Sequence, residues 1–177
     1  MKRLFLACLL MASLGYASIP QSIEIRLNSH TSVMLQISRA YEVIMGSEGD
    51  LPTLSITSED SSAFMFFGFK VESLSDELFF SKLDHQLGIM GDEVLKDQEI
   101  TIIREDGNDT RLAYYYATDY NALNVIRQGD YPYGLFGSLL TTDNVALSFV
   151  ILSMNSDRKE MHELLDVIRN ITVIHRP

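Results

Sequence analysis

Cysteine, tryptophan and proline are scarce in this sequence of 177 residues. It contains one cysteine, Cys8, no tryptophan and four prolines. A single cysteine cannot close an intramolecular disulfide, and it rules out zinc sites and redox motifs that need two or more cysteines. The glycine-rich patterns that cradle phosphates are also missing, so the sequence predicts no nucleotide cofactor, and we expect no other cofactor either.

Basic residues are few as well. The chain has 14 lysines and arginines against 24 aspartates and glutamates, which gives a formal net charge of −10. Binding to nucleic acid or to anionic lipid is driven by lysine and arginine, because these side chains displace counterions from phosphates. The charge therefore argues against both of these partners and favours a basic protein as a partner.

The N-terminus carries the pattern of an export signal. A basic pair at residues 2 and 3 precedes an apolar run over residues 4–14, and small residues occupy the two positions that determine cleavage, the second of which is Ala17. We therefore expect a secretory signal peptide, residues 1–17, that is cut after Ala17. The mature chain, residues 18–177, would then be periplasmic or secreted.

Two other interpretations of the N-terminus were weighed. The apolar run is shorter than the roughly 20 residues that cross a bilayer, so we expect no stable insertion into a membrane. The letters "FLAC" before and at Cys8 loosely resemble a lipoprotein cleavage motif, but cutting there would leave only a short apolar stretch in front of the cysteine. Cleavage after Ala17 is the better interpretation, and it would leave a mature chain without any thiol.

The early part of the mature chain reads as strands of a single domain, because no linker or repeat divides it. Residues 22–28 and 32–38 alternate apolar and polar side chains around a short polar turn, which predicts a hairpin. Residues 53–58 form the next expected strand. Residues 63–72 are almost wholly apolar, which favours a strand covered on both faces.

A helix and an antiparallel meander are expected next. Residues 73–88 have a serine N-cap, early acids and a glycine stop, which indicates a helix. The Asp106-Gly107 pair is a strong hairpin-turn signal. The apolar segment 144–154 is expected at the centre of the sheet. The other expected strands of the meander are 99–105, 110–119, 123–128 and 133–142.

The last helix is the clearest element in the sequence. We expect Ser156 as its N-cap, a buried stripe at helical spacing and a short closing strand over residues 171–174. The stripe consists of Met161, Leu164, Leu165 and Ile168. Many strands with two separated helices predict an α+β fold, in which one antiparallel sheet has two helices packed against it.

Three segments resemble the PsbP-like fold family, which includes DcrB-type bacterial envelope proteins. "LQISRAYEVI" (35–44) resembles the opening strand and turn of the family, "SLSDELFFSKL" (73–83) its first helix, and "EMHELLDVIRNITVI" (160–174) its closing helix and strand. The resemblance implies a PsbP-like layered architecture and a non-catalytic accessory or binding role. Fold analogy alone does not establish a function.

No group of residues in the sequence forms a coherent catalytic or metal-binding pattern. "HELLD" (162–166) begins like the zinc-binding H-E-x-x-H helix but has Asp166 where the second histidine must be. "DGNDT" (106–110) loosely resembles the start of a calcium loop but lacks the distal glutamate. We therefore predict a protein that is not an enzyme, with no catalytic residues and no metal ligands.

Two groups of residues are candidates for partner binding. The first is acidic, lies in the region 41–62 that we expect to be rich in loops, and would attract a basic protein or simply solvate the loops. The second combines tyrosines and an acid near strand ends, where exposed tyrosines favour interfaces. The first group is Glu48, Asp50, Glu59 and Asp60, and the second is Tyr120, Asp130, Tyr131 and Tyr133.

The tyrosines of the segment 110–119 are expected to belong to the core instead. Strand periodicity puts Leu112, Tyr114 and Tyr116 on one face, which is core-like. Tyr115 lies on the other face between two alanines, where we expect a shallower surface. Buried tyrosines are ordinary strand formers, so these rings carry no functional prediction.

Three functions remain open at this point. The first is a non-enzymatic periplasmic protein that binds or assists another protein through its acidic and tyrosine-rich surface. The second is a periplasmic immunity protein that neutralises a basic secreted toxin. The third is a small-molecule or carbohydrate-binding protein, which would require a concave pocket that a sequence does not reveal.

Overall fold

The structure is a computed structural model, and it describes residues 20–72, 75, 77–81, 85, 98–124 and 130–177. Ten strands and two helices are defined within these ranges. The strands are β1 (Gln21–Arg26), β2 (Thr31–Ile37), β3 (Tyr41–Glu48), β4 (Leu51–Ser58), β5 (Ala63–Val71), β6 (Ile103–Asp106), β7 (Thr110–Thr118), β8 (Tyr133–Thr141), β9 (Val145–Ser153) and β10 (Thr172–His175), and the helices are α4 (Tyr120–Asn124) and α5 (Lys159–Arg169).

Seven strands form the main sheet, in the order β3-β4-β5-β9-β8-β7-β6. Every neighbouring pair in this sheet is antiparallel. The most apolar strand, β9, is the fourth of the seven and therefore lies at the centre, as the sequence predicts. The meander from β6 to β9 and the turn at Asp106-Gly107 are also confirmed, since the Gly107 N–H donates to the Thr110 carbonyl over 2.8 Å.

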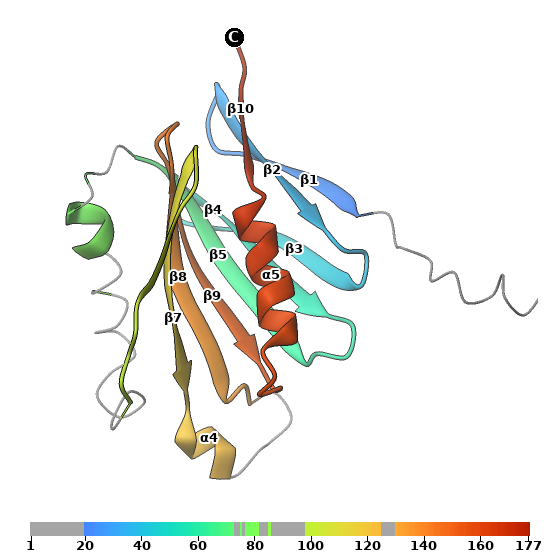
Figure 1. Ribbon diagram of the computed structural model, residues 1–177. Coiled ribbons are helices and arrows are strands. Elements are labelled where there is room, and N and C mark those ends of the chain that lie inside the picture. Colours follow the sequence, from blue (N-terminus) through green and yellow to red (C-terminus); the bar gives the residue numbers. More distant parts are fainter. Residues whose placement is uncertain (1–19, 73–74, 76, 82–84, 86–97, 125–129) are drawn as a thin grey trace, which may run out of the picture.

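A smaller sheet of three strands completes the fold. β2 lies between β1 and β10, and both pairs are antiparallel. The predicted opening hairpin is thus confirmed, and the short closing strand of the chain pairs with it. Figure 1 shows β10 leaving the end of α5 and running up beside β2.

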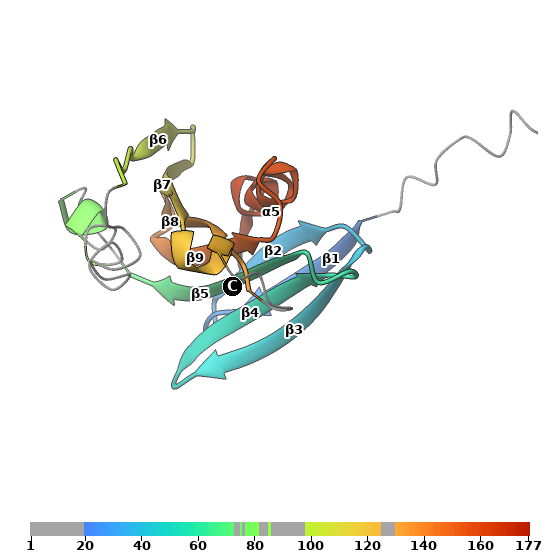
Figure 2. The ribbon, with the colours of Figure 1, turned by 90° about the horizontal axis from the view of Figure 1, so that it is seen from below.

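Helix α5 lies between the two sheets. Its predicted stripe is confirmed, because Met161, Leu164, Leu165 and Ile168 are all buried, and Val167 joins them. These side chains form one core with the inner faces of both sheets, including Val33 and Phe149. Figure 2 shows α5 above the main sheet, with β1 and β2 beside it. The α+β class with an antiparallel sheet is therefore confirmed.

A second, smaller core lies on the opposite face of the main sheet, which we call the outer face. Residues 77–81, part of the predicted helix 73–88, are helical and bring Phe79 against β7. Tyr115 is fully buried there and stacks on Phe136, with ring centres 5.5 Å apart. The prediction of a shallow surface at Tyr115 was therefore wrong, because a segment distant in sequence covers this part of the sheet.

Two local predictions were wrong. The loop expected near residue 41 is the edge strand β3, whose acids and glycine hide its strand pattern. The strand expected over 123–128 begins inside helix α4, because Asp119 accepts the Ala122 N–H through its side chain (3.2 Å) and residues 120–124 turn into a helix. Residues 125–129 lie outside the described ranges.

The start of α5 also differs from the prediction. The helix begins at Lys159, and its N-cap is Arg158 in the left-handed conformation with φ 61°, without a side-chain cap. Ser156 lies in the preceding turn. The side chain of Glu160 instead reaches back to accept hydrogen bonds from Asn155 (2.9 and 3.0 Å) and Ser153 (3.2 Å). These bonds hold the connection from β9 to the helix.

Candidate functional site

The outer face of the main sheet carries a transverse row of small residues. Cross-strand partners share one face of a sheet, so the register of the strands defines this row. It runs across six strands, and its members are Gly46, Thr53, Gly68, Ser148, Ser138 and Ala113. A row of small side chains flanked by larger ones is a trench in the sheet surface.

A row of mostly larger side chains, with one serine among them, forms one wall of this trench. It lies one pleat away on the same strands, and it consists of Ile44, Ser55, Phe66, Val150, Phe136 and Tyr115. Phe66 at the middle of this wall is 37% exposed. The prediction that 63–72 is covered on both faces is therefore wrong for β5, which is central in the sheet but open on its outer face near Phe66.

The trench widens into a groove of about 410 Å³. Phe66, Leu51, Phe79 and Ala146 are among the residues that line it, and Gly68 lies on its floor. A Cβ atom added at Gly68 would meet nothing closer than 3.8 Å, so the backbone does not require glycine here. The missing side chain leaves this part of the groove open. The volume falls within the range of about 300–1,000 Å³ that ligand sites occupy.

Polar side chains also line the groove, and Thr53 and His85 are among them. The hydroxyls of Ser138 and Ser148 face each other at 3.4 Å on its floor. Of the charged side chains that line it, Lys70 is paired with Glu72 over 3.1 Å, and Glu48 lies at the mouth on strand β3. The groove is thus mostly apolar inside and acidic at the β3 end.

The hairpin β3–β4 projects from the core beside the groove. From Ile44 to Glu48 every residue of β3 is exposed. The exposed fractions are 58% for Ile44, 64% for Met45 and 41% for Leu51. A two-residue connection closes the hairpin, with Gly49 at φ 60°, a value that glycine adopts without strain. The tip therefore presents apolar side chains to solvent, and such patches mark interaction sites.

The acidic residues predicted to cluster are divided by the structure. Glu48 and Asp50 lie at the hairpin tip beside the groove, whereas Glu59 and Asp60 lie in the turn at the opposite end of β4. Asp60 organises that turn, since its Oδ1 accepts bonds from Ser62 Oγ (2.7 Å) and Ser58 Oγ (2.8 Å). These bonds, with one from the Ser62 N–H, lower the pKa of Asp60 to about 2. The two pairs of acids cannot form one surface.

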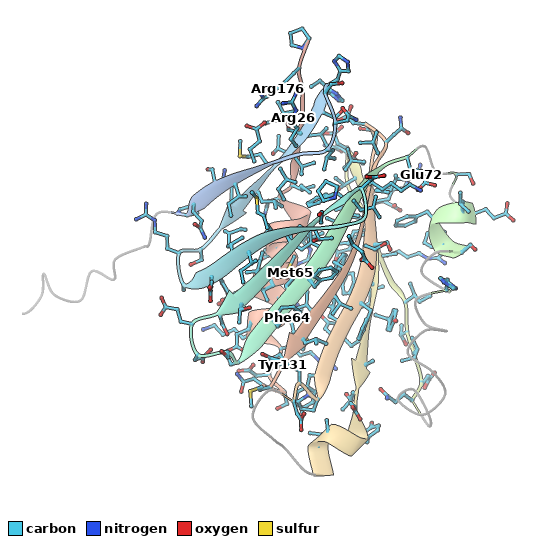
Figure 3. All side chains as sticks on the ribbon, turned by 180° about the vertical axis from the view of Figure 1, so that it is seen from behind. Arg26, Phe64, Met65, Glu72, Tyr131 and Arg176 are labelled. Atoms are coloured by element: carbon cyan, nitrogen blue, oxygen red, sulfur yellow. The ribbon has the colours of Figure 1, made fainter. Side chains whose placement is uncertain are left out.

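The predicted tyrosine surface is also divided. The Tyr131 hydroxyl donates to the Ser61 carbonyl over 3.1 Å, and its ring lies 6.5 Å from that of Phe64. Figure 3 shows Tyr131 and Phe64 at one end of β5 and Glu72 at the other. Asp130, beside Tyr131, is half-buried. These residues therefore meet the Glu59–Asp60 turn, away from the groove.

The other two tyrosines of that prediction lie elsewhere. Tyr133 opens β8 and packs partly buried against the main core. Tyr120 begins α4 and is 55% exposed, in a polar hollow that it shares with Tyr116 and Arg158. The Arg158 guanidinium lies 4.1 Å from the centre of the Tyr116 ring. Tyr120 is the member of the set that the structure leaves most open to a partner.

Outside the groove, titratable side chains gather where α5 meets β6 and β7. Arg169 donates to both carboxylate oxygens of Glu105, and the Tyr114 hydroxyl donates to the same carboxylate over 2.8 Å. The bonds from Arg169 lower the pKa of Glu105, and burial raises the pKa of Tyr114 to about 12. His162 lies 3.4 Å from the Tyr116 hydroxyl. The cluster joins helix to sheet, and each of its charges is already compensated.

Metal sites and membrane spans were sought in the ranges that the structure describes. Within them no group of three or more histidine, cysteine, aspartate or glutamate side chains lies together as a metal site requires. Among the helices of these same ranges, none is long and apolar enough to cross a membrane. Comparison of the sequence with protein-family models finds no match, and comparison with curated proteins finds none either.

The groove residues were missed by the sequence analysis. Phe66, Gly68, Ser138 and Ser148 belong to three different strands, and each is unremarkable in its own segment. The available signal was that small residues interrupt the apolar strands β5, β8 and β9 on the same face. Only the register between strands shows that these interruptions lie side by side.

Proposed function

We propose that this protein is a non-enzymatic, exported binding protein that receives apolar side chains of a partner protein in the outer-face groove. The observation that carries the proposal is the apolar groove that opens directly onto the exposed hairpin β3–β4. Apolar patches bordered by polar residues on a soluble domain mark interaction surfaces. We refer to the groove and the hairpin tip together as the outer-face site.

The extent of the apolar surface favours a protein partner over a small ligand. A small molecule that filled the groove would cover Phe66 and Gly68 but leave Ile44, which lies on the same face of the sheet, in water. A partner that covered the groove and the tip together would bury all of them. Fully buried apolar side chains at the centre of an interface supply most of its binding energy. A small-molecule or carbohydrate ligand would therefore leave the exposure of Ile44 unexplained.

The charge of the site favours a basic partner. Glu48 and Asp50 lie at the tip, and the chain as a whole has a net charge of −10. Opposite charges accelerate association and discriminate among partners, with an effect that falls as salt rises. An immunity protein for a basic toxin is one form of such a binding protein, and identification of a toxin as the partner would select it over an assembly factor.

Export and family membership are part of the same proposal. Removal of residues 1–17 after Ala17 would deliver the domain to the periplasm or the medium. The PsbP-like layered architecture that the sequence resembles, and the accessory role that this resemblance implies, belong to the proposal, and the α+β class with an antiparallel sheet supports them. N-terminal sequencing of the protein purified from the envelope fraction should start at Ser18, and an N-terminus at residue 1 would contradict export by cleavage.

Affinity capture with a groove-filling variant tests the binding function. The tagged mature domain and its Gly68→Leu variant would be incubated with envelope extract at low and moderate salt, and bound proteins would be identified by mass spectrometry. We expect one basic partner that the wild type retains and the variant loses, because leucine would occupy the floor of the groove. Glu59→Gln, at the far end of β4, should retain it.

Two results would count against this function. One is the absence of any partner that distinguishes wild type from Gly68→Leu. The other is a partner that Tyr131→Ala or Glu59→Gln removes while Gly68→Leu keeps it, because that would move the interface to the opposite end of the sheet. Circular dichroism of each variant shows that it is folded before capture is interpreted.

A further inference from the structure

Strand β3 is an unprotected edge of the main sheet. It is the first strand in the order, and within the described residues it pairs only with β4. Figure 2 shows β3 at the outer margin of the sheet. One row of its backbone N–H and C=O groups therefore faces away from the sheet, which is the geometry that accepts an added strand.

Most of the usual protections of an edge strand are missing from β3, whose only charged residues are two acids. Proteins block edges with proline, lysine, bulges or a covering element. β3 contains no proline and no lysine, and its eight residues pair with β4 in an unbroken register from Tyr41 to Glu48. From Ile44 onward no described segment covers it on either face. Its free half is a regular template about five residues long.

The charge of β3 selects the kind of strand that can be added. Its two charged residues, Glu42 and Glu48, are both acids. A second copy of this strongly acidic chain would bring like charges together, whereas a strand with a basic residue would gain attraction. We therefore favour a basic heterologous segment over self-association.

Gly46 and Glu48 define what the added strand would carry. Both lie on the outer face, and Gly46 ends the row of small residues that leads to the groove. A large apolar side chain opposite Gly46 would lie over the glycine and point along the trench, an arrangement that shields edge glycines in sheets. Two residues along, on the same face, a basic side chain would lie opposite Glu48.

We infer that the partner segment is an extended strand that pairs with β3 as an eighth strand of the sheet, with a large apolar residue over Gly46 and a basic residue beside Glu48. The inference rests on the proposed function and names the chemistry of its partner. The recognised pattern is an apolar and a basic residue two positions apart in an extended segment. The backbone of that segment bonds to β3, and its side chains supply the specificity.

Synthetic peptides test the inference without the natural partner. The probe is an acetylated, amidated octapeptide of threonines that carries one phenylalanine and, two positions away, one lysine, made in both orders. Comparison peptides replace lysine by glutamate or carry N-methyl groups on alternate residues, which removes backbone donors. Affinity is measured by NMR titration of the mature domain, and strand pairing by amide hydrogen exchange of residues 43–48.

The lysine peptide should bind about five-fold more tightly than the glutamate peptide at low salt, as cross-strand charge pairs predict. Binding of the peptide should slow amide hydrogen exchange in β3. N-methylation of the peptide should abolish this protection. Glu48→Gln should remove most of the preference for lysine, while Glu42→Gln, on the same face but six residues away along the strand, should preserve it. Gly46→Val should weaken every peptide.

Several results would overturn the inference. Equal affinity of the lysine and glutamate peptides, binding that survives N-methylation, or shifts confined to the groove without protection of β3 each contradict strand addition. Failure of all peptides to bind also overturns it. If capture from extract still depends on Gly68, the proposed function stands while this inference fails. If capture and peptides both fail, both are wrong.

Discussion

Arg169, the last residue of α5, holds both carboxylate oxygens of Glu105 on the edge strand β6. Its Nε donates to Oε2 over 2.9 Å and its Nη2 to Oε1 over 2.5 Å. The helix therefore binds one edge of the main sheet through a bidentate ion pair, the geometry in which arginine and carboxylate interact best. On the opposite edge, β3, the described residues form no comparable ion pair along the free half.

Replacing Glu105 by glutamine should lower the free energy of unfolding at pH 7 by roughly 1 kcal/mol, a value reduced for the partial exposure of the pair. The bonds from Arg169 lower the folded-state pKa of Glu105 below its ordinary value of about 4.3. The stabilisation is therefore complete above that value and is lost as pH falls through the folded-state pKa. Urea unfolding from pH 7 to pH 3 measures it.

The difference in free energy of unfolding between wild type and Glu105→Gln should thus become smaller at acidic pH. Asp166→Asn removes the more exposed ion pair of Arg169, in which Nη1 lies 2.8 Å from Asp166 Oδ1. This variant should lower the free energy of unfolding by less than Glu105→Gln does. A difference that stays constant down to pH 3, or that is already absent at pH 7, would show that the ion pair contributes nothing to folding.

Tyr115 should make the protein sensitive to alkali. Burial raises the pKa of its hydroxyl to about 12, against about 10 in an unfolded chain. The stabilisation is fully present below about pH 10 and is lost as the pH rises through the folded-state pKa of about 12. Unfolding monitored from pH 8 to pH 11.5 should show a smaller alkaline loss for Tyr115→Phe than for wild type.

Tyr120→Phe is the matched control for that titration, because Tyr120 is more than half exposed. It should leave the alkaline loss of stability unchanged. Burial likewise raises the pKa of Tyr114 to about 12 and raises those of Tyr116 and Tyr41, so these three tyrosines contribute to the loss that remains in Tyr115→Phe. Identical alkaline curves for wild type and Tyr115→Phe would mean that the Tyr115 ring is accessible in solution.

Truncation of Leu165 should destabilise the protein more than most substitutions do. Leu165 is fully buried between α5 and the two sheets. Leu165→Ala should lower the free energy of unfolding by about 2–5 kcal/mol, since both the transfer energy and the cavity contribute. Lys159→Ala, on the exposed side of the same helix, should change it by less than about 0.5 kcal/mol. Similar losses for the two variants would contradict the sandwiched position of α5.

Gly68→Val should close the groove without unfolding the sheet. The new side chain would extend into open space, and valine suits a strand better than glycine, so stability should be unchanged or slightly higher. Binding of an environment-sensitive apolar dye, seen as enhanced fluorescence, should fall clearly. Thr57→Val, on the same face near the far end of β4, should leave dye binding unchanged. Equal dye binding by Gly68→Val and wild type would mean that the groove does not hold apolar ligands.

Local patterns in the sequence determined many of the elements. The stripe from Met161 to Ile168 predicted a helix with one buried side, and Asp106-Gly107 predicted a hairpin turn, because both depend on neighbouring residues. The apolar composition of residues 144–154 predicted the central strand, because a strand at the centre of a sheet needs apolar side chains where both of its faces are covered. These features need no knowledge of distant parts of the chain.

Only the tertiary structure decided where the candidate site lies. Gly46, Gly68 and Ser148 come from three distant segments, and they form one trench only because the strand register aligns them. The burial of Tyr115 and the exposure of β3 also depend on the tertiary structure. Tyr115 is covered by a segment distant in sequence, and β3 lacks a neighbouring strand on one side, and neither fact is encoded by adjacent residues. Side-chain type and spacing fix the elements, whereas pairing between strands, which is non-local, fixes the surface they make together.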